Sequence, residues 1–339
     1  MIFGTLPGGA PVELFELSSD KLTVRISNYG GRIISVVKDG MDMIVGPKHF
    51  EDMLKDTCYC GAICGRVANR IAKGRFSIDG DSHSVAVNNG PNHLHGGTKN
   101  FANRLWESRV ETNRVVMSLL SEDGDQNYPG ELNVEAVFDF DDDNALEITY
   151  LAKTDKTTVV NLTNHVYFNL AGDGSGSILD HELRLNSSKV LEMNDKQIPT
   201  GKLLDAAGTP QDFRQFRPFR PGIGSEFNHI RDFKGYDHPF VIDGWQPNIL
   251  GEVGELREKS SGRCVKVLSS QPSVMVYTGN WLAGGCPETK TGGRYDDYDG
   301  VAIECQNYPD AVNHPDFPSP LLRPGELYCQ KIVFRFGTF

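Results

Sequence analysis

Long apolar runs are missing from this sequence, and none approaches the roughly 18 residues that a membrane span needs. The first fifteen residues lack the basic segment and apolar stretch of a signal peptide. Positive charge is scarce, because 34 Lys and Arg stand against 45 Asp and Glu, and the net charge is −11. Nucleic acid is an unsuitable partner, since its phosphates require clustered basic residues. These absences predict a cytoplasmic protein that binds neither membranes nor nucleic acid.

Cysteine pairs with the spacing of a metal site or a disulfide framework are also absent. The seven cysteines are odd in number, are spread over 339 residues and include no CxxC pair. The cluster CYCGAIC, residues 58–64, is therefore expected to supply small core thiols and not a zinc site.

Short strand-like runs make up most of the chain. Residues 21–40, KLTVRISNYGGRIISVVKDG, alternate in hydrophobicity, pass a Gly-Gly turn and continue as a second apolar run, which predicts a hairpin. Similar runs cover residues 75–87, 104–123, 132–155, 264–281 and 328–336. Residues 201–239 have few strand signals and predict a long structured excursion. No linker or repeat divides the chain, so we expect one all-β domain over residues 1–339, a large antiparallel β-sandwich or barrel.

A His-x-His pair follows one of the turns, in NNGPNHLHGGTKNF. On one strand, His93 and His95 would present both imidazoles on the same face, as in metal-binding barrels. A metal centre of that kind also needs a carboxylate about four residues later, where Lys99 and Asn100 stand instead. A turn with exposed histidines explains the motif equally well.

Two further motifs carry polar groups suited to a ligand. In CGRVANRIAKGRF, Arg66, Asn69 and Arg70 supply fixed donors that can grip hydroxyl or carboxylate oxygens, although solvated surface arginines fit the motif too. In KGYDHPFVID, Asp237 precedes a proline and a strand, and a simple Asx turn would account for it.

The run VAIECQ places a carboxylate in an otherwise apolar strand. By alternation Val301, Ile303 and Cys305 share one face, which leaves Glu304 on the other. Because an ionised carboxylate is costly to bury, Glu304 either reaches solvent or works in a polar cleft.

Taken in order along the chain, these stretches resemble the aldose 1-epimerases, also called galactose mutarotases, from end to end. NLTNHVYFNL, residues 161–170, carries a specific ten-residue histidine signature of that family. GRVANRIAKG, PNHLHGG, GYDHPF, QPSVMVYTGN and ECQNYPDAVNHPDFPSP occur in the family's order. The resemblance implies a β-sandwich of unusually large sheets with a sugar cleft, no cofactor, no metal, and a monosaccharide substrate such as galactose or glucose. It does not indicate an oligomeric state.

The resemblance also implies roles for individual residues. His165 corresponds to the catalytic acid and Glu304 to the catalytic base. The substrate-binding set that carries over consists of Asn69, Arg70, His95, Asp237 and Gln271. His93 and Arg66 carry over less strongly.

A base and an acid are what the opening of a cyclic hemiacetal requires, because the anomeric hydroxyl loses a proton while the ring oxygen gains one. With ordinary pKa values, roughly 4.3 and 6.5, Glu304 is expected to be ionised and His165 partly protonated, and Asp237 to favour the imidazolium. Other classes remain open. A glycosidase would use two opposed carboxylates, a noncatalytic sugar-binding protein would need no acid and base, and a metal-dependent isomerase would use His93, His95 and His165.

Overall fold

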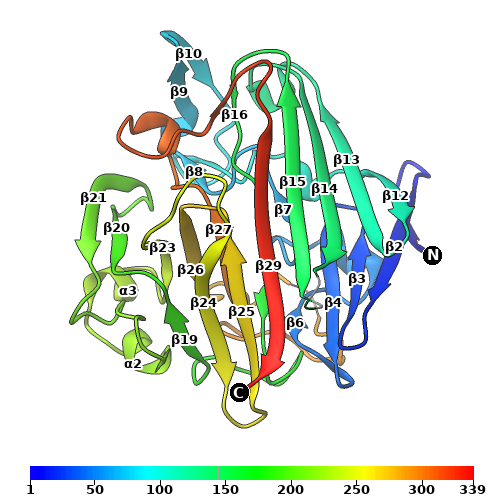
Figure 1. Ribbon diagram of the computed structural model, residues 1–339, viewed down its shortest axis with the longest axis vertical. Coiled ribbons are helices and arrows are strands. Elements are labelled where there is room, and N and C mark those ends of the chain that lie inside the picture. Colours follow the sequence, from blue (N-terminus) through cyan, green and yellow to red (C-terminus); the bar gives the residue numbers. More distant parts are fainter. Residues whose placement is uncertain (142, 144, 287) are drawn as a thin grey trace.

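Three large antiparallel sheets form most of the protein (Figure 1). The computed structural model describes residues 1–141, 143, 145–286 and 288–339. The nine-stranded sheet contains, in spatial order, β12 (Glu107–Glu111), β13 (Arg114–Ser121), β14 (Leu132–Phe140), β15 (Leu146–Thr154), β29 (Tyr328–Thr338), β25 (Arg263–Ser269), β24 (Gly251–Glu258), β19 (Glu182–Leu185) and β22 (Arg217–Pro218). The seven-stranded sheet contains β21 (Pro199–Asp205), β20 (Lys189–Met193), β23 (Asp237–Val241), β26 (Ser273–Tyr277), β27 (Val301–Gln306), β18 (Tyr167–Phe168) and β6 (Ile44–Val45). The five-stranded sheet contains β1 (Ile2–Thr5), β2 (Pro11–Ser18), β3 (Thr23–Ser27), β4 (Arg32–Lys38) and β5 (Met41–Asp42).

Short strand pairs and helices complete the fold. The two-stranded pairs are β7 (Ile63–Cys64) with β17 (Thr163–Asn164), β8 (Arg70–Ile71) with β11 (His93–Leu94), β9 (Arg75–Ile78) with β10 (Asp81–Ser84), and β16 (Thr158–Val159) with β28 (Leu321–Leu322). The helices are α1 (Phe50–Met53), α2 (Arg220–Ile223) and α3 (Asn228–Asp232), with 3-10 turns at Ala72–Gly74, Phe101–Asn103, Asp125–Asn127 and Ala311–Asn313. No helix in the described ranges is long and apolar enough to cross a membrane.

The main core lies between the nine-stranded sheet and the other two. Along β14 every second residue is buried, and this inward set comprises Leu132, Val134, Ala136 and Phe138. It packs in one apolar cluster with Val24 of β3 and Ile303 of β27. Period-2 alternation therefore forms the sandwich, because each strand contributes one apolar face to the shared core.

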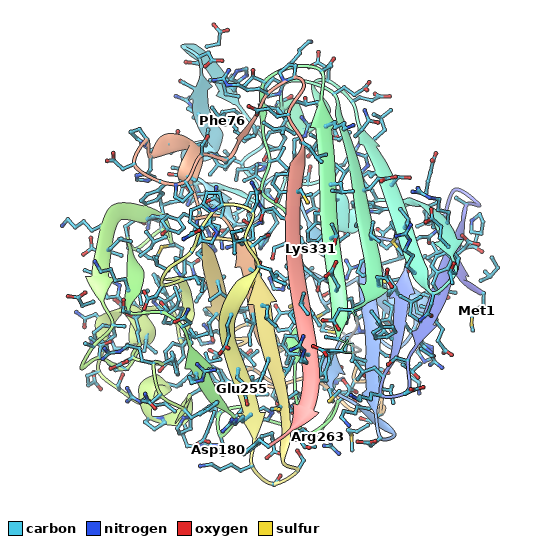
Figure 2. The ribbon with its side chains drawn as sticks, in the orientation of Figure 1. Met1, Phe76, Asp180, Glu255, Arg263 and Lys331 are labelled. Atoms are coloured by element: carbon cyan, nitrogen blue, oxygen red, sulfur yellow. The ribbon has the colours of Figure 1, made fainter. Side chains whose placement is uncertain are left out.

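Strand β29 joins the two halves of the nine-stranded sheet. It pairs with β15 on one side and β25 on the other, and in Figure 1 it is the red strand at the centre. Figure 2 labels Lys331 on this strand, in its first half. Its ammonium group lies 2.5 Å from Glu147 of β15, so an ion pair lies across the junction.

The predicted all-β antiparallel sandwich is confirmed. Residues 21–40 form the β3–β4 hairpin, and the five other strand-rich runs each contain the strands expected of them. Asn144, in the break within residues 132–155, lies outside the described residues. The stretch 201–239 holds α2, α3 and the two-residue β22 between the ends of β21 and β23, as the scarcity of strand signals predicted.

Candidate active site

A cavity of about 350 Å³ opens beside the seven-stranded sheet and gathers polar side chains from distant parts of the chain. Its volume is at the lower end of the range for small-molecule sites, about 300 to 1,000 Å³. The lining residues are Thr57, Cys58, Tyr59, Asn69, Arg70, Asn89, Leu94, His95, His165, Tyr167, Gln197, Asp237, Tyr277, Trp281 and Glu304. Of the seven site residues that the sequence predicted, six lie here.

Glu304 reaches the cavity because β27 is buried on both faces. Val301, Ile303 and Cys305 pack in the main core, as alternation predicted. Ala302, on the opposite face, belongs to a separate apolar cluster, and Glu304 shares that face. Only 2% of Glu304 is exposed, so the carboxyl group is held in the cavity wall and does not lie on an outer surface.

His165 stands between two short strands that fix its backbone. It follows β17, which pairs with β7, and precedes β18, which pairs with β27. Its N–H donates to the carbonyl of Ala62, and its own carbonyl accepts from the N–H of Gly61, both at 2.9 Å. The imidazole is thereby directed at Glu304, with its Nε2 3.5 Å from Glu304 Oε1.

Burial changes the charges expected for this pair. It lowers the pKa of His165 to about 4, and it raises the pKa of Glu304 well above its ordinary value, an effect that Asp237 reinforces and Arg70 opposes. The expectation of an ionised Glu304 and a partly protonated His165, favoured by Asp237, therefore runs against the direction of both pKa shifts. Desolvation outweighs nearby charge, so the pKa of each group is shifted in the direction that favours its neutral form.

Two polar atoms of the pair have no hydrogen-bond partner in the part of the chain that the structure describes. They are Nδ1 of His165 and Oε2 of Glu304, and both are buried. An unpaired buried polar atom costs about 1 to 3 kcal/mol. Native structures keep few such atoms, and a site that binds a polar ligand is one of the reasons for keeping them.

Asn69 and His95 are hydrogen-bonded to each other, and both have strained backbone. The N–H of Asn69 donates to Nδ1 of His95 at 3.1 Å, so the other ring nitrogen of His95 remains free for a ligand. Both residues have left-handed backbone, with φ of 62° and 48°. Tyr59 and Gln197 in the cavity wall share this conformation, with φ of 59° and 56°. Non-glycine residues rarely adopt it, and such strain is typical of functional sites.

Arg70 and Asp237 face the cavity with a carboxamide between them. Arg70 donates from Nε to Oδ1 of Asn89 at 3.1 Å and from Nη2 to Oε1 of Gln197. Gln197 in turn donates from Nε2 to Asp237. Burial lowers the pKa of Arg70 and raises that of Asp237.

Gln271 does not line this cavity, which separates it from the other predicted binding residues. It lies ahead of β26, borders a different hollow, and donates its amide to the Leu162 carbonyl and the Tyr328 hydroxyl. On β26 the residue paired with Glu304 is Met275, and Tyr277 reaches the cavity wall. The side chain that β26 contributes to the cavity wall is therefore that of Tyr277, six residues after Gln271.

Neither interpretation of the His-x-His pair holds, because the two rings do not share one strand face and both histidines are buried. Strand β11 ends at Leu94, and the left-handed backbone of His95 turns its ring toward His165. His93 points elsewhere, with its ring nitrogens bonded to the Ala86 carbonyl and the Tyr128 hydroxyl. It is therefore a structural residue.

Arg66 is structural as well. Its guanidinium donates to the carbonyls of Pro129, Gly130 and Ser121 and to the hydroxyl of Thr158. These bonds hold the ends of β13 and β16 to the turn at residues 129–130, and of the two arginines only Arg70 lines the cavity.

A metal would find possible ligands in the cavity. His95, His165 and Glu304 each offer one ligand atom, and these atoms lie within 4.8 Å of one another. Two histidines and a carboxylate form a set that transition metals accept. The metal-dependent alternative in its original form fails, however, because His93 is engaged outside the cavity.

Sequence reasoning missed several wall residues. These are Thr57, Cys58, Tyr59, Asn89, Leu94, Tyr167, Gln197, Tyr277 and Trp281. Tyr59 stands inside the cysteine cluster that we interpreted as core, and Tyr167 directly follows the histidine signature. Trp281 is 60% exposed, and the ammonium group of Lys234 lies over its ring, 3.6 Å from the centroid. The signal available in the sequence was the tryptophan itself, directly after the YTGN motif.

The chain is similar to known proteins in both its sequence and its fold. A profile of the aldose 1-epimerase family matches residues 13–335. The chain belongs to the aldose 1-epimerase family. A galactose mutarotase from Bos taurus is 42% identical over 99% of this chain and 98% of its own length. An aldose 1-epimerase from Escherichia coli K12 is 35% identical over 97% of this chain and 96% of its own. The solved structure of a galactose 1-epimerase from Lactobacillus acidophilus is 27% identical, superposes with a TM-score of 0.88, and covers 100% of this chain and 98% of its own.

The epimerase is thus an isomerase that acts on carbohydrate, and the predicted resemblance is confirmed. Aldose 1-epimerases interconvert the α and β anomers of an aldose. That reaction exchanges protons at two oxygens, which the paired His165 and Glu304 at the cavity wall are suited to do.

Proposed function

We propose that the cavity binds aldohexoses, galactose and glucose among them, and that His165 and Glu304 transfer the two protons of anomerisation. The observation that carries the proposal is the 3.5 Å approach of His165 Nε2 to Glu304 Oε1 in the wall of a polar, sugar-sized cavity. Asn69, Arg70, His95 and Asp237 hold the sugar hydroxyls.

The cycle follows from the single proton that the pair holds. With the proton on His165, the imidazolium protonates the ring oxygen while the carboxylate of Glu304 removes the anomeric proton, and the ring opens. The pair then carries its proton on Glu304, which is the state that burial favours. Rotation about C1–C2 presents the other face of the aldehyde. Closure reverses both transfers and returns the proton to His165.

Activity should depend on pH as this one-proton state does. Because the pKa of His165 is lowered to about 4, a second proton joins the pair only well below the ordinary histidine value of about 6.5. Because the pKa of Glu304 is raised, the last proton leaves only well above the ordinary glutamate value. We expect kcat/KM to stay level as the pH falls through 6.5 and to decline closer to 4. Polarimetry with the spontaneous rate subtracted measures the profile. A half-loss of kcat/KM at pH 6.5 would contradict the assignment.

The overall function is tested by following freshly dissolved α-galactose and α-glucose toward equilibrium. The protein should accelerate the change in optical rotation without altering the final value, because an epimerase catalyses both directions. A protein that bound these sugars without accelerating anomerisation would be a sugar-binding protein instead.

Metal removal separates the organic acid–base mechanism from metal catalysis. Dialysis against a strong chelator should leave the anomerisation rate unchanged, because His165 and Glu304 suffice for both proton transfers. Loss of activity that zinc or manganese restores would instead assign His95, His165 and Glu304 as ligands.

A cytoplasmic location and a single domain complete the proposal. All seven cysteines are free thiols, which suits a reducing compartment. One apolar cluster draws side chains from all three sheets, which supports one domain over residues 1–339.

A further inference from the structure

The turn between β20 and β21 carries Gln197 to the cavity wall and is itself firmly held. Asn194 accepts from the N–H groups of Lys196 and Ile198 at 2.8 and 3.2 Å. Asn92 donates its side-chain amide to the Lys196 carbonyl at 3.0 Å. With φ of 56°, the backbone of Gln197 is left-handed. The side chain is therefore presented to the cavity at a fixed position, at a cost in backbone strain.

The carboxamide of Gln197 separates two opposite charges. Its oxygen accepts from Arg70 and its nitrogen donates to Asp237. The ion pairs found within 4.0 Å among the described residues do not include Arg70 with Asp237. A neutral group thus occupies the place where a direct ion pair would form, which keeps both charged side chains facing the cavity.

Each end of this carboxamide keeps one hydrogen-bonding position. A primary amide has two N–H donors and an oxygen with two lone pairs, and one of each is used by Asp237 and Arg70. One donor and one acceptor remain, on the adjacent nitrogen and oxygen of the group. Two neighbouring sugar hydroxyls match them, since one accepts from the N–H and the other donates to the carbonyl.

We propose that Gln197 is a specificity-determining residue that reads a vicinal pair of sugar hydroxyls between Arg70 and Asp237. The inference rests on the proposed function and adds a discriminating contact to it. Gln197 has no proton to exchange near neutral pH, so it acts on the choice of sugar and not on the proton transfers. A sugar that lacks one of the two hydroxyls leaves a polar group of the amide unpaired, which is how hydrogen-bonding sites reject deoxy analogues.

The test compares the parent, Gln197→Leu and Gln197→Asn on galactose, glucose and their 2-, 3-, 4- and 6-deoxy derivatives. For the parent, kcat/KM should fall about 10- to 100-fold with the deoxy sugars that lack a recognised hydroxyl. Gln197→Leu should lose a similar factor on the full sugars, mostly in KM, and almost nothing on those same deoxy sugars. Gln197→Asn keeps the amide and suits left-handed backbone but is one methylene too short, so it should behave like Gln197→Leu.

Lys196→Met is the matched control, because that side chain lies on the same turn and is 59% exposed. It should leave the sugar preference of the parent intact. If the Gln197 variants lose the same factor on every sugar, or nothing on any, Gln197 is only a spacer and the inference is overturned. A parent protein that anomerises no aldose would overturn the proposed function itself, and the inference with it.

Discussion

Replacing His165 with Asn or Glu304 with Gln should lower kcat for anomerisation by about 10²- to 10⁴-fold, the usual effect of losing one proton-transfer group. Both substitutions preserve approximate shape and can still hydrogen-bond a sugar, so KM should change much less than kcat. Because the two groups pass protons at opposite ends of one event, the double variant should be scarcely slower than the slower single variant. Polarimetry with subtraction of the uncatalysed rate measures all three.

His181→Gln is the control for the general effect of removing a buried histidine. Burial also lowers the pKa of His181 to about 4, but His181 does not line the cavity and its Nε2 accepts from the Leu170 N–H. The control should lose some thermal stability and keep the parent kcat at temperatures where it is folded. A folded His165→Asn protein with near-parent kcat would leave His165 as a structural residue.

Gly61→Ala should destabilise the protein by about 2 to 4 kcal/mol and reduce activity beyond the loss of folded protein. The backbone of Gly61 is left-handed, with φ of 68°, and an added Cβ would lie 2.1 Å from the carbonyl oxygen of Ile33. That oxygen belongs to backbone, and the N–H of Ile33 is itself bonded to the Gly61 carbonyl. Relief of the clash must therefore shift Gly61, whose N–H holds the carbonyl of His165.

Gly262→Ala is the control that introduces the backbone strain without the clash. Gly262 also has φ of 68°, yet the nearest atom to its added Cβ is the carbonyl oxygen of Phe339 at 3.8 Å, an ordinary contact. This control should cost only the roughly 1 to 2 kcal/mol of left-handed backbone. Thermal and denaturant unfolding compare the two. Equal losses in both variants would show that the loop around Gly61 adapts to a side chain.

The strands could be predicted because their sequence pattern and their burial have the same cause. Alternation along β14 and β27 records which side chains meet the core, and this was sufficient to direct Glu304 away from it. The resemblance to a family then supplied the partners of Glu304, which lie more than 60 residues from it in sequence. Neither source predicted the protonation of the pair, because that depends on how completely the surroundings exclude water.

The cavity wall was harder to predict where the backbone departs from local preference. Tyr59, Asn69, His95 and Gln197 all have left-handed backbone, which asparagine and histidine adopt more often than other side chains but which is uncommon for any of the four. The contacts that impose it come from elsewhere in the chain, such as the bond from Asn92 to the turn of Gln197. Extending the strand pattern through His95 therefore placed its ring on the wrong face.

The central position of β29 bears on how fast the chain can reach this structure. β29 pairs Thr149 with Lys331 and Val267 with Phe334, so the two groups of strands in the large sheet remain unjoined until a strand from far along the chain docks between them. Closing such a long loop costs conformational entropy before any cross-strand contact offsets it. Domains dominated by distant pairings fold in milliseconds to seconds or longer. Until β29 has docked, β15 and β25 each present an unpaired edge to other molecules. Refolding at high protein concentration should therefore favour aggregation.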